Sequence, residues 1–521
     1  MSTSNMQTPI TSYLSLLQDA GFTLAYGRDP YCAKVKQGLT WTPELMAAEL
    51  KNGRVCQLTD AQVAWGGVAF TAAAQRGASI ACWAARLNKW GTDGLSKLGE
   101  APAGASPSQL QVWAQLRDTA PGGALLTGGP GSGKTWLMGQ LVTRLTEAGL
   151  KVKVVAPSAK AAHVLSTKLR SERVRPTTIH RALGIRPGRE QYAQKLGCDA
   201  LVMDEASMAD EMLLGLLLSC VDRKCFVLLC GDQRQLPPVG AGQPFRDLCE
   251  TKTEVPVLRL LEQHRNDGTD IGRLATAVFE GSYRPEDFQG SRSVTCFRAS
   301  ADTATEKASA FYTGDYLNRT HGRVGVESTL ILSPVRAAQY EASIVHLNKS
   351  ISDTLHPTAV RVTKHLRVGD RVMFSFNDEE LGTVNGATGY ITGYRSAEED
   401  GSWAVSITED TGQKHLLGSH DFDERRDIAT FISPAAAMTV YKAQGSEADH
   451  VLVLLDQRLA FTYTREMLLT AITRAKKSVT IMGDVSMLAS AHLRTSRRLT
   501  CLQWFLAALT REVVHEMVQY S

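Results

Sequence analysis

The chain has 521 residues, which is too many for a single hydrophobic core and predicts two to four domains. Apolar residues make up 43% of the sequence and charged residues 21%. This balance is that of an ordinary globular protein and excludes disordered and fibrous classes. The net charge is only +4, so overall charge does not indicate nucleic-acid binding, although a local basic groove stays open.

The ten cysteines are scattered, with no C-x-x-C pair and no Cys/His cluster at zinc spacing. Such usage favours reduced, mostly buried thiols in a cytoplasmic protein. Residues 1–17 lack the basic start and long apolar core of a signal peptide, and no apolar stretch reaches membrane length. We therefore expect a soluble cytoplasmic protein with no membrane partner.

Residues 1–92 have apolar residues at helical spacing but no chemical motif. They contain four of the eight tryptophans: Trp41, Trp65, Trp83 and Trp90. We expect a small helical accessory domain with an aromatic core, and a surface for duplex DNA or a protein partner is the alternative. Residues 93–107 are rich in Gly, Ala, Ser and Pro, which predicts a linker.

A glycine-rich turn stands between a short apolar run at 124–127 and a helical pattern that starts at Trp136. In that setting a G-x-x-x-x-G-K-[ST] turn binds phosphate, because glycines let backbone N–H groups surround it. The helix start adds its own unpaired N–H groups and a positive dipole end. The turn comprises Gly128, Gly129, Pro130, Gly131, Ser132, Gly133, Lys134 and Thr135.

Two side chains of this turn predict the cofactors. Lys134 is placed to reach the β- and γ-phosphates of ATP, and the Thr135 hydroxyl is placed to ligate Mg²⁺. A helix at 108–116 leads into the preceding strand, and Gln109 or Gln111 on it could read the adenine edge by paired hydrogen bonds. A solvated helix glutamine is an equally good interpretation.

Strand-like runs at 152–156, 200–203 and 226–230 alternate with helical patterns. This order predicts an α/β fold with a parallel sheet and crossover helices, the RecA-like form of the P-loop fold. Asp204 and Glu205 follow the second run directly, and ligands of such sheets collect where strands end. We interpret the pair as a Walker B motif, in which Asp204 holds Mg²⁺ and Glu205 is the general base.

The third run ends in Gly231-Asp232-Gln233-Arg234-Gln235-Leu236-Pro237-Pro238, which resembles motif III of superfamily 1 helicases. Gln235 could hydrogen-bond both the γ-phosphate and the attacking water. Further segments resemble motifs of the same superfamily in the expected order: 156–162 motif Ia, 178–181 the next DNA-contacting motif, Arg265 the motif IV arginine, 439–447 motif V and 470–475 motif VI. From about residue 105 to residue 490 the chain resembles the RecD/Dda-like branch, superfamily 1B.

This resemblance implies two RecA-like lobes with a small inserted β-barrel, and 5′-to-3′ movement on DNA. It assigns Glu447 to the nucleotide site and the following residues to the DNA track: Ser158, Lys160, Thr178, His180, Pro237, Thr439, Tyr441 and Lys442. Taken alone, each of Ser158, Lys160, Thr178 and His180 fits a helix cap or a surface position better. The chain departs from the family at Tyr441, where histidine is usual, and at Leu469, where tyrosine is common.

Arg265 and Arg474 fall outside the first predicted sheet. We expect them to reach the γ-phosphate across a cleft and stabilise the charge that develops as its bond breaks. A guanidinium suits this task because it is always charged and binds phosphate oxygens in pairs.

Residues 185–196 read as a small hairpin with a turn at Arg186-Pro187-Gly188-Arg189. In the family, an insertion here forms the pin that splits the duplex, and Tyr192 could stack on a base. A plain connecting loop is the alternative.

The domain boundaries follow from these assignments. We expect the first RecA-like lobe over 108–262 and the second over 263–367 and 428–521. Short, turn-punctuated strands over 368–427 predict the inserted β-barrel. The tail at 499–520 has an amphipathic helical pattern and is expected to pack on the second core.

Together these features predict an ATP-dependent DNA helicase that unwinds duplex DNA by moving on single-stranded DNA, in replication, recombination or repair. Its partners would be single-stranded DNA and tailed or forked duplexes, bound by a monomeric motor. One alternative is an RNA helicase of similar two-lobe design. Another is a subunit of a recombination complex in which motor activity is secondary, although intact Lys134, Glu205 and Gln235 argue against its loss.

Overall fold

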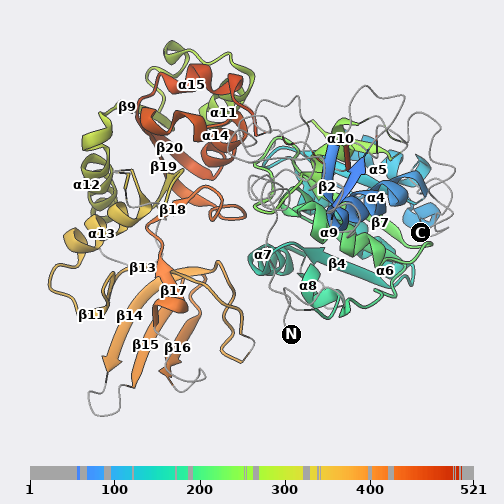
Figure 1. Ribbon diagram of the computed structural model, residues 1–521, viewed down its shortest axis with the longest axis horizontal. Coiled ribbons are helices and arrows are strands. Elements are labelled where there is room, and N and C mark those ends of the chain that lie inside the picture. Colours follow the sequence, from blue (N-terminus) through green and yellow to red (C-terminus); the bar gives the residue numbers. More distant parts are fainter. Residues whose placement is uncertain are drawn as a thin grey trace, which may run out of the picture. The chain divides into compact units, whose positions relative to one another are not determined.

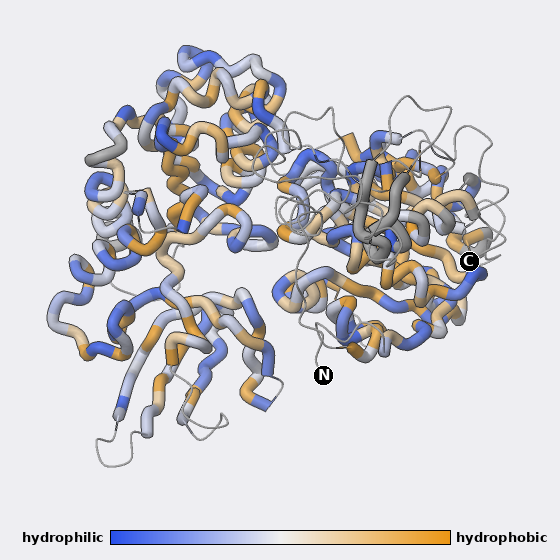
Figure 2. Tube along the Cα trace, viewed as in Figure 1, coloured by the Kyte–Doolittle hydropathy of each residue, from blue (hydrophilic) through white to orange (hydrophobic). Residues whose placement is uncertain are grey.

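The computed structural model describes residues 55–58, 67–86, 95–119, 122–169, 173–185, 192–251, 253, 255–261, 269–320, 329–336, 339–340, 342–378, 380–396, 402–419, 428–496, 498, 500, 502–503 and 506. The chain divides into two compact units (Figure 1). Unit 1 comprises Met1–Pro157, Val164–His264 and Arg497–Ser521, and unit 2 comprises Ser158–His163 and Arg265–Ser496. Figure 2 shows hydrophobic residues along the central strands of each unit. Within the described ranges, no helix is long and apolar enough to cross a membrane.

Unit 1 is built on a six-stranded sheet whose neighbouring strands pair in parallel. Its strands, in chain order, are β3 (Gly123–Gly128), β4 (Val152–Ala156), β5 (Thr177–Thr178), β6 (Ala200–Met203), β7 (Phe226–Gly231) and β8 (Val257–Leu260). They lie side by side in the order β5-β4-β6-β7-β3-β8. The predicted α/β fold with a parallel sheet is therefore confirmed for this unit. The carboxyl ends of β6, β7 and β3 lie next to one another at one edge.

Helices cover both faces of this sheet, because its strands are apolar on both sides. Their bounds are α4 (Thr71–Arg86), α5 (Pro107–Thr119), α6 (Lys134–Glu147), α7 (Ala159–Leu169), α8 (Ile179–Ala182), α9 (Glu211–Ser219) and α10 (Pro244–Glu250). One core joins Trp113 of α5 and Leu141 of α6 to the strands. The other core contains Ile80 of α4 and Leu214 of α9.

The described part of residues 1–92 differs from the helical accessory domain expected there. Two strands, β1 (Val55–Leu58) and β2 (Gly67–Phe70), pair antiparallel, and the helix α4 follows them. The helix α4 packs directly on α9, where a Cβ on Gly215 would lie 2.9 Å from the Arg76 carbonyl oxygen. An entirely helical region is therefore wrong, since residues 55–58 and 67–70 form strands. The separate domain and its boundary at residue 92 stay predictions, and Trp41, Trp65 and Trp90 lie outside the described residues.

Unit 2 contains a second parallel sheet, in the order β18-β10-β19-β20-β9. Its strands are β9 (Val294–Arg298), β10 (Thr329–Ser333), β18 (Ala437–Thr439), β19 (Ala448–Leu455) and β20 (Ala475–Gly483). Its helices are α11 (Asp270–Glu280), α12 (Ala301–Thr320), α13 (Ile344–Leu355), α14 (Arg465–Ile472) and α15 (Met487–Ser490). One buried core joins Tyr312, Leu347 and Leu452. Both units thus have the open, parallel α/β form expected of RecA-like lobes.

The inserted region is antiparallel, as its alternating pattern predicts. Its strands are β13 (Arg371–Phe374), β14 (Thr388–Ser396), β15 (Trp403–Glu409), β16 (Lys414–Gly418) and β17 (Ile432–Pro434), preceded by a short pair, β11 (Arg361–Thr363) and β12 (Leu366–Arg367). They form one sheet in the order β16-β15-β14-β13-β17 over a separate core that includes Val372 and Val405. No pairing joins β16 to β17 within the described ranges, so closure into a barrel stays a prediction.

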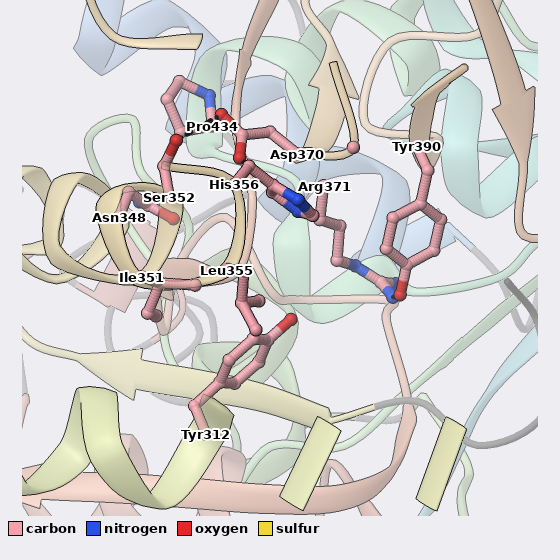
Figure 3. Close-up of a pocket in the computed structure, with 12 residues that line it drawn as sticks. Tyr312, Asn348, Ile351, Ser352, Leu355, His356, Asp370, Arg371, Tyr390 and Pro434 are labelled. Carbon is pink, nitrogen blue, oxygen red and sulfur yellow. Dashed lines mark hydrogen bonds and ion pairs between the residues drawn. The ribbon is translucent and has the colours of Figure 1, made fainter. Parts of the chain in front are cut away.

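A buried carboxylate fixes the start of this insertion to α13 (Figure 3). Asp370 Oδ2 accepts hydrogen bonds from Ser352 Oγ at 2.8 Å and from the backbone N–H of Arg367 at 2.7 Å. Burial raises the pKa of the Asp370 carboxyl, and these two donors oppose that shift. Gly369 lets the backbone approach the His356 ring, which a Cβ would meet at 2.6 Å. The hollow beside them is lined by α12, α13, β13, β14 and β17.

The prediction that the tail packs on the second core is wrong for its described residues. Leu502 and Leu506 are fully buried in the core of unit 1 that also contains α4 and α9. Thr500 Oγ1 donates to Asp247 Oδ2 at 2.6 Å, and the backbone N–H of Leu502 donates to Glu211 Oε1 at 2.9 Å. An amphipathic pattern shows that one face is buried, but it does not show which core buries it.

Candidate nucleotide-binding site

The glycine-rich turn has the backbone that a phosphate loop requires. Strand β3 ends at Gly128, α6 begins at Lys134, and Gly131 and Gly133 have positive φ values of 77° and 82°. A side chain at Gly128 has no room, because its Cβ would lie 2.5 Å from Ser132 Oγ and 3.2 Å from the Leu260 carbonyl oxygen. The turn therefore brings backbone N–H groups to the start of α6 with no Cβ in the way.

Lys134 folds over this turn. Its Nζ donates to the carbonyl oxygens of Gly128 at 2.6 Å and Gly129 at 3.0 Å. The Ser132 hydroxyl is buried and has no hydrogen-bond partner within the described part of the chain. A positive ammonium, an unpaired hydroxyl and a helix start at one loop fit a polyphosphate, which can bond to all three.

Asp204 and Glu205 follow β6 at the same edge of the sheet. Burial and, to a smaller extent, the Glu205 charge raise the pKa of Asp204 to about 6, against the lowering effects of the Glu205 backbone N–H and the Lys134 ammonium. Asp204 Oδ1 accepts the Glu205 backbone N–H at 2.9 Å. Glu205 has φ 52°, and it is the one non-glycine residue with positive φ in the described ranges. Strained backbone of this kind is concentrated at functional sites.

Gln235 follows β7, the strand that lies between β6 and β3 in the sheet. Asp232 is buried, and its Oδ1 accepts the Arg234 backbone N–H at 3.0 Å, while its carbonyl accepts the Gln235 N–H at 3.1 Å. These bonds hold residues 232–235 in a tight turn, so Gln235 leaves the sheet at a defined point. The side chain of Gln235 lines a hollow shared with Ser207 and Gln243.

The cysteines near this edge are core residues, as expected. Cys230 is fully buried, and burial together with the neighbouring Asp204 raises the pKa of its thiol well above the ordinary value. Cys220 and Cys225 are also buried and unbridged. No group of three or more His, Cys, Asp or Glu side chains that could hold a metal occurs in the described part.

Gln109 has a structural partner that explains its position. Its Oε1 accepts the Ser106 backbone N–H at 2.9 Å, and Ser106 Oγ lies 3.5 Å from the Gln109 backbone nitrogen. This is a reciprocal capping box at the start of α5. Gln109 is buried, whereas Gln111 is exposed. Neither contact assigns an adenine ligand, so that role stays a prediction for both residues.

In unit 2, Arg474 connects the two segments that resemble motifs V and VI. Its side chain is buried, with Nε donating to the Thr470 carbonyl at 3.0 Å and Nη1 donating to the Ser446 carbonyl at 3.2 Å. The Ala448 backbone N–H in turn donates to the Arg474 carbonyl at 3.0 Å. The guanidinium is thereby oriented by backbone oxygens before any phosphate is present. Arg265 lies outside the described residues.

The sequence comparisons agree with this arrangement of two units. Residues 104–295 match the family model of an AAA domain, and residues 434–482 match that of a UvrD-like helicase C-terminal domain. The RecBCD enzyme subunit RecD of Mycolicibacterium smegmatis is 28% identical over 473 residues, which cover 79% of this chain and 79% of that protein. The chain is therefore similar to RecD proteins over most of its length.

Two further similarities are more distant or more partial. The ATP-dependent RecD2 DNA helicase of Deinococcus radiodurans is 27% identical over 421 residues, which cover 79% of this RecD-like chain and 54% of that protein. A crystal structure of Pif1 helicase from Bacteroides in complex with ADP-AlF3 and ssDNA aligns with 16% identity and a TM-score of 0.46, over 72% of this chain and 92% of that one.

Four of the predicted DNA-track residues lie at or in α7 and α8; Ser158 and Lys160 belong to unit 2, and Thr178 and His180 belong to unit 1. Thr178 Oγ1 caps α8 by accepting the Arg181 N–H at 3.2 Å, and Ser158 Oγ accepts the Ala161 N–H at 3.2 Å at the start of α7, which contains Lys160. His180 lies in α8 and is half-buried. Pro237 is buried. The hydroxyl oxygens of Ser158 and Thr178 thus cap helix starts, where backbone N–H groups also favour a phosphate. These bonds fit a cap as well as a DNA contact, so a DNA role stays a prediction.

The candidate pin is only partly described. Tyr192 is 64% exposed, and Gln194 N–H donates to the Leu183 carbonyl at 3.0 Å. The predicted turn at Arg186-Pro187-Gly188-Arg189 lies outside the described residues. The hairpin stays a prediction, and an exposed tyrosine near its base is what stacking would need.

The predicted residues of motif V lie at the end of β18 and on the loop that follows it. Thr439 Oγ1 accepts the Lys442 backbone N–H at 3.3 Å, and Tyr441 is half-buried. Partial burial and the neighbouring Arg336 lower the pKa of the Lys442 ammonium. Glu447 Oε2 lies 3.8 Å from Lys476 Nζ. All of them share one short loop of unit 2 with Ser446, the acceptor of Arg474.

Sequence reasoning missed four polar groups around the motif III hollow. Each has a buried side-chain oxygen without a partner in the described ranges: Ser207 Oγ, Asp232 Oδ2, Gln233 Oε1 and Gln243 Oε1. Asp232 could have been singled out, because it ends a fully buried strand in the same way as Asp204. Ser207 carries no comparable signal, since a serine after an acidic pair reads as a cap.

Proposed function

We propose that this RecD-like chain is an ATP-dependent DNA helicase that moves 5′ to 3′ on single-stranded DNA. The observation that carries the proposal is the meeting of three motifs at one sheet edge. The phosphate loop, the Asp204–Glu205 pair and Gln235 follow three strands that lie next to one another, β3, β6 and β7. Its RecD relatives support the reaction, and the resemblance to superfamily 1B supports the direction of movement.

The residues of unit 1 divide the chemistry of ATP hydrolysis among them. The phosphate loop and Lys134 would hold the β- and γ-phosphates, while Thr135 and Asp204 would hold Mg²⁺, which supplies charge neutralisation between the phosphates. Glu205 would accept a proton from the attacking water as general base. Gln235 would orient that water and register the presence of the γ-phosphate. Each role uses a donor or acceptor that the strand ends already bring to this edge.

Arg474 would stabilise the negative charge that develops on the γ-phosphate, with Arg265 as its proposed companion. The carbonyls of Thr470 and Ser446 orient the guanidinium, so little side-chain freedom has to be lost when it binds phosphate. Closure of the two units on ATP and reopening after hydrolysis would form a two-state hinge. Alternating affinity for the DNA strand in the two states would convert that cycle into one-way movement.

The DNA strand would contact the polar residues that follow strands or begin helices: Ser158, Lys160, Thr178, His180, Thr439, Tyr441 and Lys442. Backbone phosphates would take most of these contacts, so binding would be insensitive to base sequence. The natural substrates would be tailed or forked duplexes, and the motor would act as a monomer in the cytoplasm. The unbridged cysteines of the described part are compatible with a reducing compartment.

The test is ATP hydrolysis by the full chain with poly-dT, with poly-U and without polymer. We expect poly-dT to stimulate hydrolysis strongly and poly-U to stimulate it much less. Greater stimulation by poly-U would instead support an RNA helicase, since 2′-hydroxyl groups distinguish the two polymers. Lys134→Ala is the control for a contaminating ATPase. Equal hydrolysis by wild type and Lys134→Ala would contradict the proposed site.

A further inference from the structure

The loop that continues motif III is pressed against the start of α9. A Cβ on Gly242, which has φ +88°, would lie 2.6 Å from Glu211 Cβ, and a Cβ on Gly240 would collide with the Asp210 carboxylate. The backbone N–H of Glu211 donates to the carbonyl of Ala241, which lies between these glycines, at 3.0 Å. Glycines are therefore required here for close approach, and Gly240 and Gly242 have no side chains that could hold the loop.

Arg498 donates hydrogen bonds that hold this loop. Its Nη1 donates to the Gly240 carbonyl at 2.7 Å and to the Gly242 carbonyl at 3.0 Å. The carbonyl of Arg498 lies 3.4 Å from Gln243 Nε2, which donates to it. One residue of the C-terminal segment thus bonds to three residues of the loop, and it does so mainly through charge-assisted hydrogen bonds.

Asp247, in the first turn of α10, anchors the same segment from the other side. Its carboxylate accepts hydrogen bonds from Thr500 Oγ1 at 2.6 Å, from Gln503 Nε2 at 2.7 Å and from Gln243 Nε2 at 3.1 Å. Asp247 is buried, as are Thr500 and Leu502. Hydrogen bonds and apolar packing together therefore hold the described residues of 498–506 against unit 1.

The upstream end of the same segment is fixed in unit 2. Glu466, buried in α14, accepts Thr495 Oγ1 at 2.9 Å on Oε1 and the Ser496 backbone N–H at 3.0 Å on Oε2. The helix α14 leads directly into Arg474. The chain from Thr495 to Arg498 consequently connects the helix before the motif VI arginine to the loop after the motif III glutamine.

We propose that Arg498 is a positioning residue for ATP hydrolysis, which holds the 236–243 loop and through it Gln235. The proposal rests on the proposed function. Without the guanidinium, two carbonyls of a glycine loop lose their donor, and the path from Gln235 to α10 loses its fixed point.

The test compares Arg498→Ala and Arg498→Lys with wild type in the full chain. Arg117→Ala is the matched control, because its guanidinium is exposed and pairs only locally with Asp118. We expect Arg498→Ala to lower kcat of DNA-stimulated hydrolysis about 10-fold, since a displacement of about 1 Å can cost ~100-fold. The KM for ATP and the Kd for ADP should stay within about 2-fold, because the phosphate loop is untouched. Lys at 498 keeps a cationic donor and should restore part of kcat.

Amide hydrogen exchange supplies a readout that does not depend on activity. Exchange at 239–243 should accelerate in Arg498→Ala and not in Arg117→Ala, because only the first change frees the loop. If Arg498→Ala fails to fold, Thr500→Val removes one bond to Asp247 at nearly constant volume and should shift the same amides less strongly.

Three outcomes would overturn the proposal. The first is wild-type kcat in Arg498→Ala. The second is unchanged exchange at 239–243. The third is a parallel fall of kcat, nucleotide affinity and melting temperature, which would show a merely structural role. Failure of the proposed function looks different, because wild type itself would then hydrolyse ATP no faster than Lys134→Ala.

Discussion

The two parallel sheets of this chain share one construction and differ at the ends of their strands. In unit 1, β3 runs into the glycine turn and α6, and an acidic pair ends β6. In unit 2, β10 ends in Ser333 and Pro334, and the groups near the sheet include the buried Arg474. The scaffold is therefore the same, and the chemistry lies in the short segments that follow the strands.

The two units therefore offer different chemical groups. Unit 1 offers backbone N–H groups, an ammonium and carboxylates, which together can hold a nucleotide and activate water. Unit 2 offers a guanidinium held by the carbonyls of Thr470 and Ser446. A cation that comes from a separate unit stabilises the transition state only when that unit is in place, so hydrolysis can depend on conformation.

The largest effect is expected from breaking the unit 1 site at Lys134. Lys134→Ala should lower DNA-stimulated ATP hydrolysis by about 10³-fold, because removal of one preorganised charge or donor costs about 10²–10³-fold in rate. The measurement is steady-state release of phosphate with saturating single-stranded DNA. Lys151→Ala, at an exposed position before β4, is the control and should match wild type. Retention of more than a tenth of the activity in Lys134→Ala would contradict the assignment.

A smaller effect is expected from the unit 2 group. Arg474→Lys should lower kcat by roughly 10²-fold, because lysine keeps the charge but loses the planar fork that can bond carbonyls and phosphate together. Nucleotide affinity should change little, since unit 1 would provide most contacts to ATP under the proposed function. Lys477→Ala, an exposed neighbour, is the control. A weaker Kd for ATP with unchanged kcat would show that Arg474 contributes to ground-state binding of ATP. It would contradict a separate role of unit 2 in the transition state.

The buried carboxyl of Asp247, which anchors the C-terminal segment, makes the stability of unit 1 sensitive to pH. Burial raises the pKa of Asp247 to about 7, from an ordinary value of 3.8. The folded state therefore favours the neutral carboxyl, and this stabilisation is complete below pH 4 and lost as pH rises through 7. Relative to Asp247→Asn, the unfolding free energy of wild type should fall by up to about 1.4 kcal/mol per pH unit in that window. Chemical denaturation between pH 4 and 8 measures it, and parallel curves for the two proteins would refute the raised pKa.

The smallest effect is expected at the start of α5. Gln109→Ala removes one half of the capping box and should cost about 1 kcal/mol of unfolding free energy. Gln111→Ala, at an exposed site, should cost much less. Binding of ATP and GTP to the same variants tests the adenine role separately. A selective loss of ATP affinity in Gln109→Ala would add that role, and equal affinities would leave only the cap.

Much of unit 1 was predictable because local signals coincide there. Apolar runs end at Gly128, Met203 and Gly231, and in each case a polar motif follows, so these strands and the site edge follow from pattern alone. The capping box at Ser106 and Gln109 was also readable, since S-x-x-Q before an apolar pattern is its signature. Gln109 is instead predicted as a candidate adenine ligand, because a glutamine can read the adenine edge by paired hydrogen bonds.

The remaining features depend on contacts that no local pattern encodes. The positive φ of Glu205 is imposed by its surroundings and opposes the preference of a glutamate. Residues 55–58 and 67–70 form strands in a region predicted to be helical, since short apolar runs do not distinguish a strand from a helix. The burial of Leu502 in unit 1 depends on Asp247 and Glu211, which are more than 200 residues away in the sequence.

The central claim is that ATP hydrolysis at the unit 1 edge drives one-way movement on a DNA strand. Unwinding of a short duplex with a single-stranded 5′ tail, compared with the same duplex carrying a 3′ tail, tests it most directly. The account predicts ATP-dependent strand separation from the 5′ tail alone, and none with Lys134→Ala. Separation from the 3′ tail alone would contradict the direction of movement, and separation by Lys134→Ala would contradict the motor itself.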